Sequence, residues 1–74
     1  MNSFDMKAFG HRLRMARTDA KLSQGELAKK AEVSLTTIST CERGETIPML
    51  STAFQLAVAL NCTPNDLMGW KEAV

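Results

Sequence analysis

The chain has 74 residues with a formal net charge of +1, and 45% of its residues are hydrophobic. This length allows one domain at most and the apolar content suffices for a packed core, so we expect a single folded domain over residues 1–74. The sequence has no run of about 18 apolar residues and no basic segment followed by an apolar one near Met1, so we expect a cytoplasmic protein without a transmembrane helix or a secretory signal.

The first two helices are predicted from periodicity and capping. Apolar residues recur at helical spacing from about Phe4 to Thr18, which predicts the first helix. Ser23 and Glu26 have the spacing of a capping box, in which the side chain of each residue satisfies a backbone amide of the other. A second helix therefore begins after Ser23, and its pattern extends to about Ala31.

The third predicted helix follows after a turn of two residues. Ser34 is its expected N-cap, Ile38 and Cys41 face inward, and Gly44 suits the left-handed position that follows a helix end. Glu42 lies in the last turn, where the helix dipole disfavours an anion. We therefore expect a cationic partner for Glu42 from another part of the fold.

The fourth and fifth helices are predicted from prolines and caps. Pro48 suits the first turn of a helix that continues through Leu60 and ends at Asn61, while Thr63 and Pro64 are a cap and first turn of a short fifth helix. The inward stripe of the fourth helix is expected to consist of Leu50, Ala53, Leu56, Ala57 and Leu60. Five short helices with short turns and no predicted strand indicate an all-α fold with steep helix crossings.

Two serine-capped helices separated by a tight turn, residues 23–31 and 34–43, have the geometry of a helix-turn-helix. Such a turn projects the second helix so that its first turns can enter a DNA major groove. The chain has seven basic and two acidic residues over 7–30, but two basic and five acidic residues over 31–74. A basic first half fits either phosphate binding or a solvated helix surface, and charge alone leaves both open.

A longer pattern covers most of the chain, from about Phe9 to Leu67. It consists of Leu22-Ser23-Gln24-Gly25-Glu26-Leu27-Ala28, Val33-Ser34, Thr37-Ile38-Ser39, Glu42-Arg43-Gly44, Pro48 and Leu56-Ala57-x-x-Leu60. This pattern resembles the Cro/repressor family of helix-turn-helix domains. The resemblance implies a compact five-helix lambda-repressor-like fold, a homodimer that binds an inverted-repeat operator through the recognition helix 34–43, and transcriptional repression without enzymatic activity or a cofactor.

The resemblance also implies roles for individual residues. Contacts to bases in the major groove fall to Leu35, Thr36, Ser39 and Thr40. Contacts to the DNA backbone fall to Gln24, Thr37, Arg43 and Lys29. An ion pair between Arg17 and Glu42 would supply the cation that the dipole argument requires, whereas a phosphate contact or plain solvation is the alternative for Arg17.

The chain departs from the family pattern at three positions. Glu32 takes a turn position usually filled by glycine, so a non-glycine residue has to adopt a left-handed conformation at a cost of roughly 1 kcal/mol. Gly25 lies inside the second helix, at a cost of about 0.5–1 kcal/mol relative to alanine. Cys41 replaces a larger residue and makes the core smaller.

The recognition helix has short side chains. Between Ser34 and Cys41 there is no Arg, Lys, Asn or Gln, so the bidentate pairs that select guanine or adenine are missing. Leu35 and the threonine methyl groups can contact thymine methyls. We therefore expect thymine methyls, bridging water and DNA deformability to carry much of the specificity.

Other functions remain open at this point. A protein-interaction module or an antitoxin-type partner protein could use the same fold. Catalysis is not expected, because no nucleophile–base pair, paired carboxylates or glycine-rich phosphate loop is present. Cys41, Cys62 and His11 lack the paired spacings of a zinc site, so both cysteines are expected to be buried free thiols.

Several large side chains could serve either the core or a partner. We expect a core or half-buried position, with any exposed members at a dimer contact, for Met49, Phe54, Val58 and Met68. Trp70 is expected either to cover the core or to contact a dimer partner.

Overall fold

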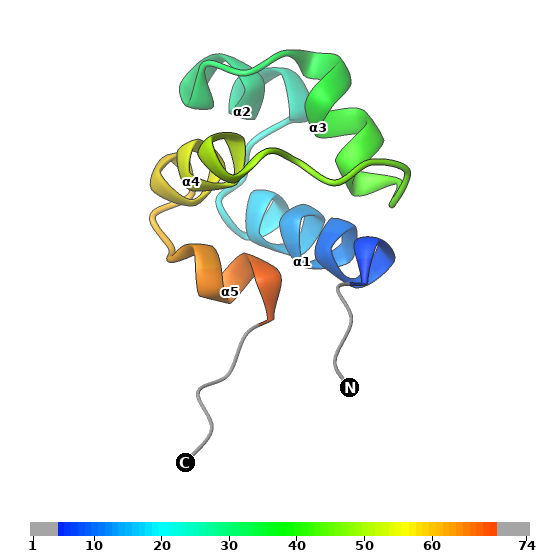
Figure 1. Cartoon of the computed structure of the whole chain (residues 1–74). Coiled ribbons are helices and arrows are strands. Elements are labelled where there is room, and N and C mark those ends of the chain that lie inside the picture. Colours follow the sequence, from blue (N-terminus) through cyan, green and yellow to red (C-terminus); the bar gives the residue numbers. More distant parts are fainter. Residues whose placement is uncertain (1–4, 70–74) are drawn as a thin grey trace.

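The computed structural model describes residues 5–69, and in this part of the chain it has five helices and no strand (Figure 1). The helices are α1 (Met6–Asp19), α2 (Gln24–Ala31), α3 (Leu35–Glu42), α4 (Leu50–Ala59) and α5 (Pro64–Met68). Helix α1 packs against α3 and α5, and α4 packs against α2 and α5. Helices α2 and α3 also pack against each other and lie together at one end of the molecule (Figure 1). The expected all-α five-helix fold is confirmed.

Side-chain caps determine where most of the helices begin. Ser23 and Thr63 form complete capping boxes with Glu26 and Asp66, and Ser34 accepts a hydrogen bond from the amide of Thr37. Asp5 accepts hydrogen bonds from two amides of the first turn of α1. Helix α1 thus begins at Met6 rather than near Phe4, because Asp5 is its cap.

Helix α4 begins two residues later than expected. Met49, in an extended conformation, is the N-cap residue, and its carbonyl accepts the first helical hydrogen bond from the amide of Ala53 at 2.9 Å. Pro48 therefore lies before the helix; its fixed φ permits a helix start without requiring one. As a result Leu50 lies at the first helical position and is 79% exposed, so its predicted place in the inward stripe is wrong.

Helices α1 to α4 all end in the same hydrogen-bond motif. A residue at the C-cap of α2, or just beyond the C-cap of the other three, has a positive φ, and the residue after it donates a hydrogen bond back to a carbonyl five positions earlier, as in a Schellman motif. The positive-φ residues are Lys21, Glu32, Gly44 and Asn61. The expected left-handed conformations of Glu32 and Gly44 are confirmed, whereas that of Lys21 had no signal in its residue type.

Glu32 carries an avoidable backbone cost. Its φ of 59° and ψ of 42° are unfavourable for a side chain with a Cβ, and its carboxylate lies at the negative end of the α2 dipole. We expect Glu32→Gly to raise the free energy of unfolding by about 0.5–1 kcal/mol. Urea denaturation should show a higher midpoint with an unchanged slope, and a lower midpoint would contradict this account of the turn.

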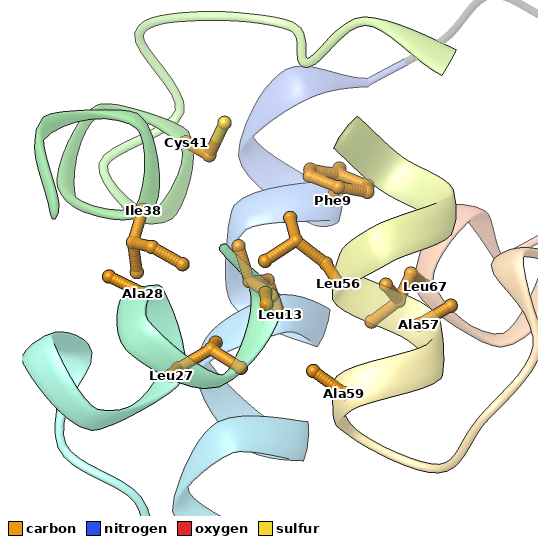
Figure 2. Packing of buried hydrophobic residues seen from close by; sticks show 11 residues of the cluster. Phe9, Leu13, Leu27, Ala28, Ile38, Cys41, Leu56, Ala57, Ala59 and Leu67 are labelled. Atoms are coloured by element: carbon orange, nitrogen blue, oxygen red, sulfur yellow. The ribbon is translucent and has the colours of Figure 1, made fainter. Parts of the chain in front are cut away.

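All five helices contribute to one buried core (Figure 2). Its largest fully buried side chains are Phe9, Leu13, Leu27, Ile38, Leu56, Leu67 and Cys41. The two cysteines are unpaired; Cys41 is buried, but Cys62 is half-buried rather than buried as expected. Partial burial, together with the charge of Asp66, raises the pKa of the Cys62 thiol.

Four side chains expected in or near the core are in fact exposed. They are Met49, Phe54, Val58 and Met68. The buried positions of α4 are three alanines and Leu56, so the larger Phe54 and Val58 lie on its outer face. Met49 lies before α4, and Met68 is the last residue of α5. Trp70 lies outside the described residues.

Candidate nucleic-acid interface

The turn between α2 and α3 fixes the direction of α3. The amide of Val33 donates to the carbonyl of Ala28 at 3.0 Å, and Val33 packs against the core. Ser34 then caps α3, and Ile38 points back toward Ala28 of α2 (Figure 2). With Ile38 and Cys41 fully buried, the opposite face of α3 has to point away from the molecule.

The outer face of α3 contains the four residues predicted to contact bases. Leu35 is 52% exposed and Thr36 is exposed, while Ser39 and Thr40 are half-buried. The structure thus brings these side chains to one helix face, as the spacing i, i+1, i+4 and i+5 requires. This face is uncharged, with one apolar side chain among hydroxyl groups.

Thr37 lies at the edge of this face, beside the start of the helix. Its hydroxyl is 2.7 Å from that of Ser34, and its amide donates to Ser34 Oγ at 3.0 Å. Thr37 therefore takes part in the cap of α3. Together the two hydroxyls form a polar edge at the α2–α3 turn.

Arg43 lies just after α3 and is held by two neighbours. Its Nε and Nη2 donate to the carboxylate of Glu45 at 3.0 and 3.1 Å, and its Nη1 donates to Ser39 Oγ at 2.6 Å. The hydrogen bonds and charge of Arg43 lower the pKa of the Glu45 carboxyl. An exposed pair of this kind contributes at most about 1 kcal/mol, so a competing anion can displace Glu45 easily.

Gln24 and Lys29 lie at opposite ends of α2. Gln24, half-buried at the first helical position, donates from Nε2 to Glu42 Oε1 at 2.9 Å. One of the two hydrogens of this amide group is therefore used within the protein. Lys29 is exposed in the last turn of α2.

The Arg17–Glu42 ion pair connects α1 to the end of α3. Nε and Nη2 of Arg17 donate to the two carboxylate oxygens of Glu42 at 2.6 and 3.0 Å, and Nη1 donates to the carbonyl of Leu22 at 2.9 Å. The side chains of Arg17 and Glu42 are only 15% and 4% exposed. With Gln24, this cluster binds α1, α2 and α3 together, and it satisfies the charge of Glu42 in the last turn of α3.

The Glu42 carboxyl experiences opposing influences on its pKa. Burial, the largest single influence, would raise it, but the hydrogen bonds from Arg17 and Gln24 and the charges of Arg17 and Arg14 together outweigh burial. The pKa of Glu42 therefore lies below its ordinary value. The folded state therefore stabilises the ionised form of Glu42.

This shift predicts how stability depends on pH. Because the pKa of Glu42 is lower in the folded than in the unfolded chain, its stabilisation is present above the unfolded value of about 4.3 and is lost as the pH falls through the folded value. We expect the free energy of unfolding to fall below about pH 5 and to fall less steeply in Glu42→Gln. Urea denaturation between pH 3 and 7 measures this, with Glu32→Gln, which removes an exposed carboxylate outside the Arg17–Glu42 cluster, as the control. Equal acid sensitivity of wild type and Glu42→Gln would contradict it.

Two residues near this surface were not found by sequence reasoning. A Cβ built on Gly44 would lie 2.8 Å from Cγ of Lys7, so the Lys7 side chain covers the end of α3 near Arg43. Thr46, in the α3–α4 loop, donates a hydrogen bond to Thr40 at 3.0 Å. Neither contact has a local sequence signal, because each depends on how the chain returns to α3.

The described residues contain no cluster of three or more His, Cys, Asp or Glu side chains that could hold a metal ion. No described helix has both the length and the apolar character needed to cross a membrane.

Comparisons with known proteins find a helix-turn-helix family and structures of regulators. The family model described as helix-turn-helix matches residues 13–67. The restriction-modification controller protein C.AhdI from Aeromonas hydrophila is 36% identical, with a TM-score of 0.82 over 85% of this chain and 96% of that one. The P22 c2 repressor, solved in complex with a synthetic operator, is 38% identical, with a TM-score of 0.77 over 81% of this chain and 91% of that one.

A third similar structure is the clp gene regulator ClgR from Corynebacterium glutamicum, at 27% identity and a TM-score of 0.80 over 90% of this chain and 71% of that one. No match was found among curated protein sequences. The similar structures are regulators and indicate no enzymatic family.

Proposed function

Because the chain belongs to the Cro/C1-type helix-turn-helix family and has the fold of repressor and controller regulators, we propose that it is a transcriptional regulator that binds a specific operator in double-stranded DNA through α3. The observation that carries this proposal is the exposed, uncharged face of α3, which the Arg17–Glu42 cluster and the α2–α3 turn hold away from the core. The P22 c2 repressor, which is 38% identical, was solved on an operator. Repression is the proposed outcome, and a cytoplasmic location stays a prediction.

We propose that residues around this face contact the DNA backbone. Arg43 can exchange Glu45 for a phosphate, since the pair that it would give up is exposed. Gln24 can donate the second hydrogen of Nε2 to a phosphate while the first stays bonded to Glu42. Thr37 and Lys29 supply a hydroxyl and a charge at the edge of α3 and at the end of α2.

Base readout falls to the short side chains of α3. Leu35 and Thr36 present exposed apolar and hydroxyl groups, which suit a thymine methyl and single hydrogen bonds. Ser39 and Thr40 lie one turn further along the helix. Without bidentate pairs, part of the specificity has to come from bridging water and the deformability of the site.

A selection from randomised duplex DNA at two salt concentrations tests this function. We expect enrichment of an inverted repeat whose half-sites lie about 10 bp apart, with affinity that falls steeply with salt because bound phosphates release counterions. No enrichment at low salt by folded protein would refute the proposal.

Variants of Arg43 and Glu45 test whether Arg43 contacts the DNA backbone or a base. Arg43→Ala should weaken binding to all sequences about equally and reduce the salt slope by about 1. Glu45→Gln should do the opposite and tighten binding, because it frees Arg43 and removes an anion near the phosphates. A change of sequence preference in either variant would place Arg43 in the groove instead.

We further propose that the protein binds its operator as a homodimer through the outer face of α4 and the loop before it. This α4 face consists of the exposed apolar side chains Ile47, Met49, Leu50, Phe54 and Val58. The chain has no charged residue from 46 to 65, so two copies can bring these faces together without like-charge repulsion. Lys30 and Glu32 line a shallow depression beside Phe54 and Val58, which places opposite charges at the rim.

Phe54→Glu tests this dimer. A glutamate at the same place in both copies should weaken self-association at least about tenfold, because like charges would meet in an apolar contact. Sedimentation equilibrium measures the association, and Met15→Glu is a control at an exposed apolar residue of α1 outside the α4 face. Unchanged association of Phe54→Glu would move the dimer contact elsewhere.

The same α4 face supports a second candidate function, that of a protein-interaction module. A monomer that binds no DNA but keeps this apolar face would favour it over the regulator, and an antitoxin-type protein is one example. Sedimentation and DNA selection together distinguish the two functions.

A further inference from the structure

A chain of hydrogen bonds connects the core to the outer face of α3. The Cys41 thiol lies 3.6 Å from Thr46 Oγ1, Thr46 Oγ1 donates to Thr40 Oγ1 at 3.0 Å, and Thr40 Oγ1 donates to the carbonyl of Thr36 at 2.9 Å. Thr40 Oγ1 is also 3.3 Å from the carbonyl of Thr37. Thr40 is therefore the link between the recognition helix and the loop that leads to α4.

The hydroxyl of Thr40 has one hydrogen and two lone pairs. A carbonyl can only accept, so the hydrogen of Thr40 is used by the protein, and one lone pair receives the hydrogen of Thr46. If Thr40 donated to Thr46 instead, its hydrogen would still be used inside the protein. In both arrangements Thr40 can offer a base a lone pair but no hydrogen.

Ser39 has the opposite capacity. Its Oγ accepts a hydrogen bond from Nη1 of Arg43 at 2.6 Å, which leaves its own hydrogen free to donate. Two hydroxyls on the same helix face are thus oriented differently by the residues behind them.

We propose that Thr40 contacts its base pair as a hydrogen-bond acceptor, and that Thr46, outside the helix-turn-helix, is a positioning residue that reinforces this polarity. In the major groove the donors are the amino groups of adenine N6 and cytosine N4, whereas guanine and thymine present acceptors. The base opposite Thr40 is therefore A or C on the strand that it contacts, and not G or T. This inference rests on the proposed DNA-binding function.

If Thr40 turned its hydrogen toward a base, it would lose the hydrogen bond to the carbonyl of Thr36 and gain one to the base. Accepting from an amino group adds a bond without breaking any, so the preference corresponds to about one hydrogen bond, or about 2–10-fold in affinity. Thr46 strengthens the preference because its donation holds the rotamer of Thr40 and supports the bond to Thr36.

The test is the same DNA selection carried out with four variants. Thr40→Val keeps the shape but removes the hydroxyl, and Thr40→Ser keeps the hydroxyl. Thr46→Val removes the positioning hydroxyl, and Thr46→Ser retains it as the matched control. Thermal denaturation of each variant verifies that it is folded.

We expect wild type to select A or C over G or T at one position of each half-site. Thr40→Val should lose about 2–10-fold of that preference at this position alone, and Thr40→Ser should keep it. Thr46→Val should reduce it, and Thr46→Ser should preserve it.

Each contrary outcome has its own meaning. Selection of G or T at the position that Thr40→Val alters overturns the acceptor assignment, and so does a Thr40→Val profile identical to wild type. An unchanged preference in Thr46→Val overturns the role of Thr46. If wild type enriches no sequence at all, the proposed DNA-binding function fails, and this outcome differs from all the others.

Discussion

Replacing Arg17 with methionine is expected to lower the free energy of unfolding by about 3–5 kcal/mol, because it leaves the carboxylate of Glu42 buried without its cation. Glu42 is only 4% exposed, and the hydrogen bond from Gln24 cannot replace two charge-assisted ones. A domain of 74 residues has a stability of about 4–11 kcal/mol. Arg17→Met should therefore leave a marginal domain or an unfolded one.

Two variants identify the cause of this loss. Arg12→Met removes an exposed arginine from the same helix that is not among the charges acting on Glu42, and it should change stability by less than about 0.5 kcal/mol. The double variant Arg17→Met with Glu42→Leu removes both charges, and it should be more stable than Arg17→Met alone because no buried carboxylate remains. Urea denaturation of all three measures these differences. If the double variant were no more stable than Arg17→Met, the loss would come from packing of the arginine stem instead.

The sequence was sufficient to predict features that depend on nearby residues. The caps at Ser23, Ser34 and Thr63 need only a hydroxyl and an amide two or three positions later, so they were found from spacing alone. The need of Glu42 for a cation also followed from its place in the last turn of α3. The family resemblance then supplied Arg17 as the partner, which periodicity could not have identified.

Features that depend on contacts between distant segments were missed. Pro48 allows a helix start without requiring one, so the first turn of α4 was placed too early and Leu50 was assigned to the core. Thr46 meets Thr40 only because the α3–α4 loop folds back along α3. The hydrogen bond of Gln24 to Glu42 likewise results from the packing of α2 on α3, and the predicted phosphate contact of Gln24 stays a prediction.

Gly10 makes a further contact between distant segments. This contact predicts a second large effect on the free energy of unfolding. It lies in the buried face of α1, where a Cβ would overlap the carbonyl oxygen of Cys41 and lie 2.8 Å from that of Glu42. These are backbone atoms at the end of α3 and cannot rotate away as a side chain would. Gly10→Ala should therefore force α1 and α3 apart and cost about 2–3 kcal/mol, despite the better helix propensity of alanine.

Gly25→Ala is the matched control, because it makes the same substitution in a helix with open space around it. The nearest atom to a Cβ on Gly25 is Ser23 Oγ at 3.9 Å, so this variant should gain about 0.5–1 kcal/mol from lower chain entropy in the unfolded state. Since Gly10 sets the distance between α1 and α3, Gly10→Ala should also weaken the proposed operator binding at temperatures where it remains folded, whereas Gly25→Ala should not. Denaturation midpoints that move in the same direction for both variants would show that helix propensity, and not the close approach of α1 to α3, governs Gly10.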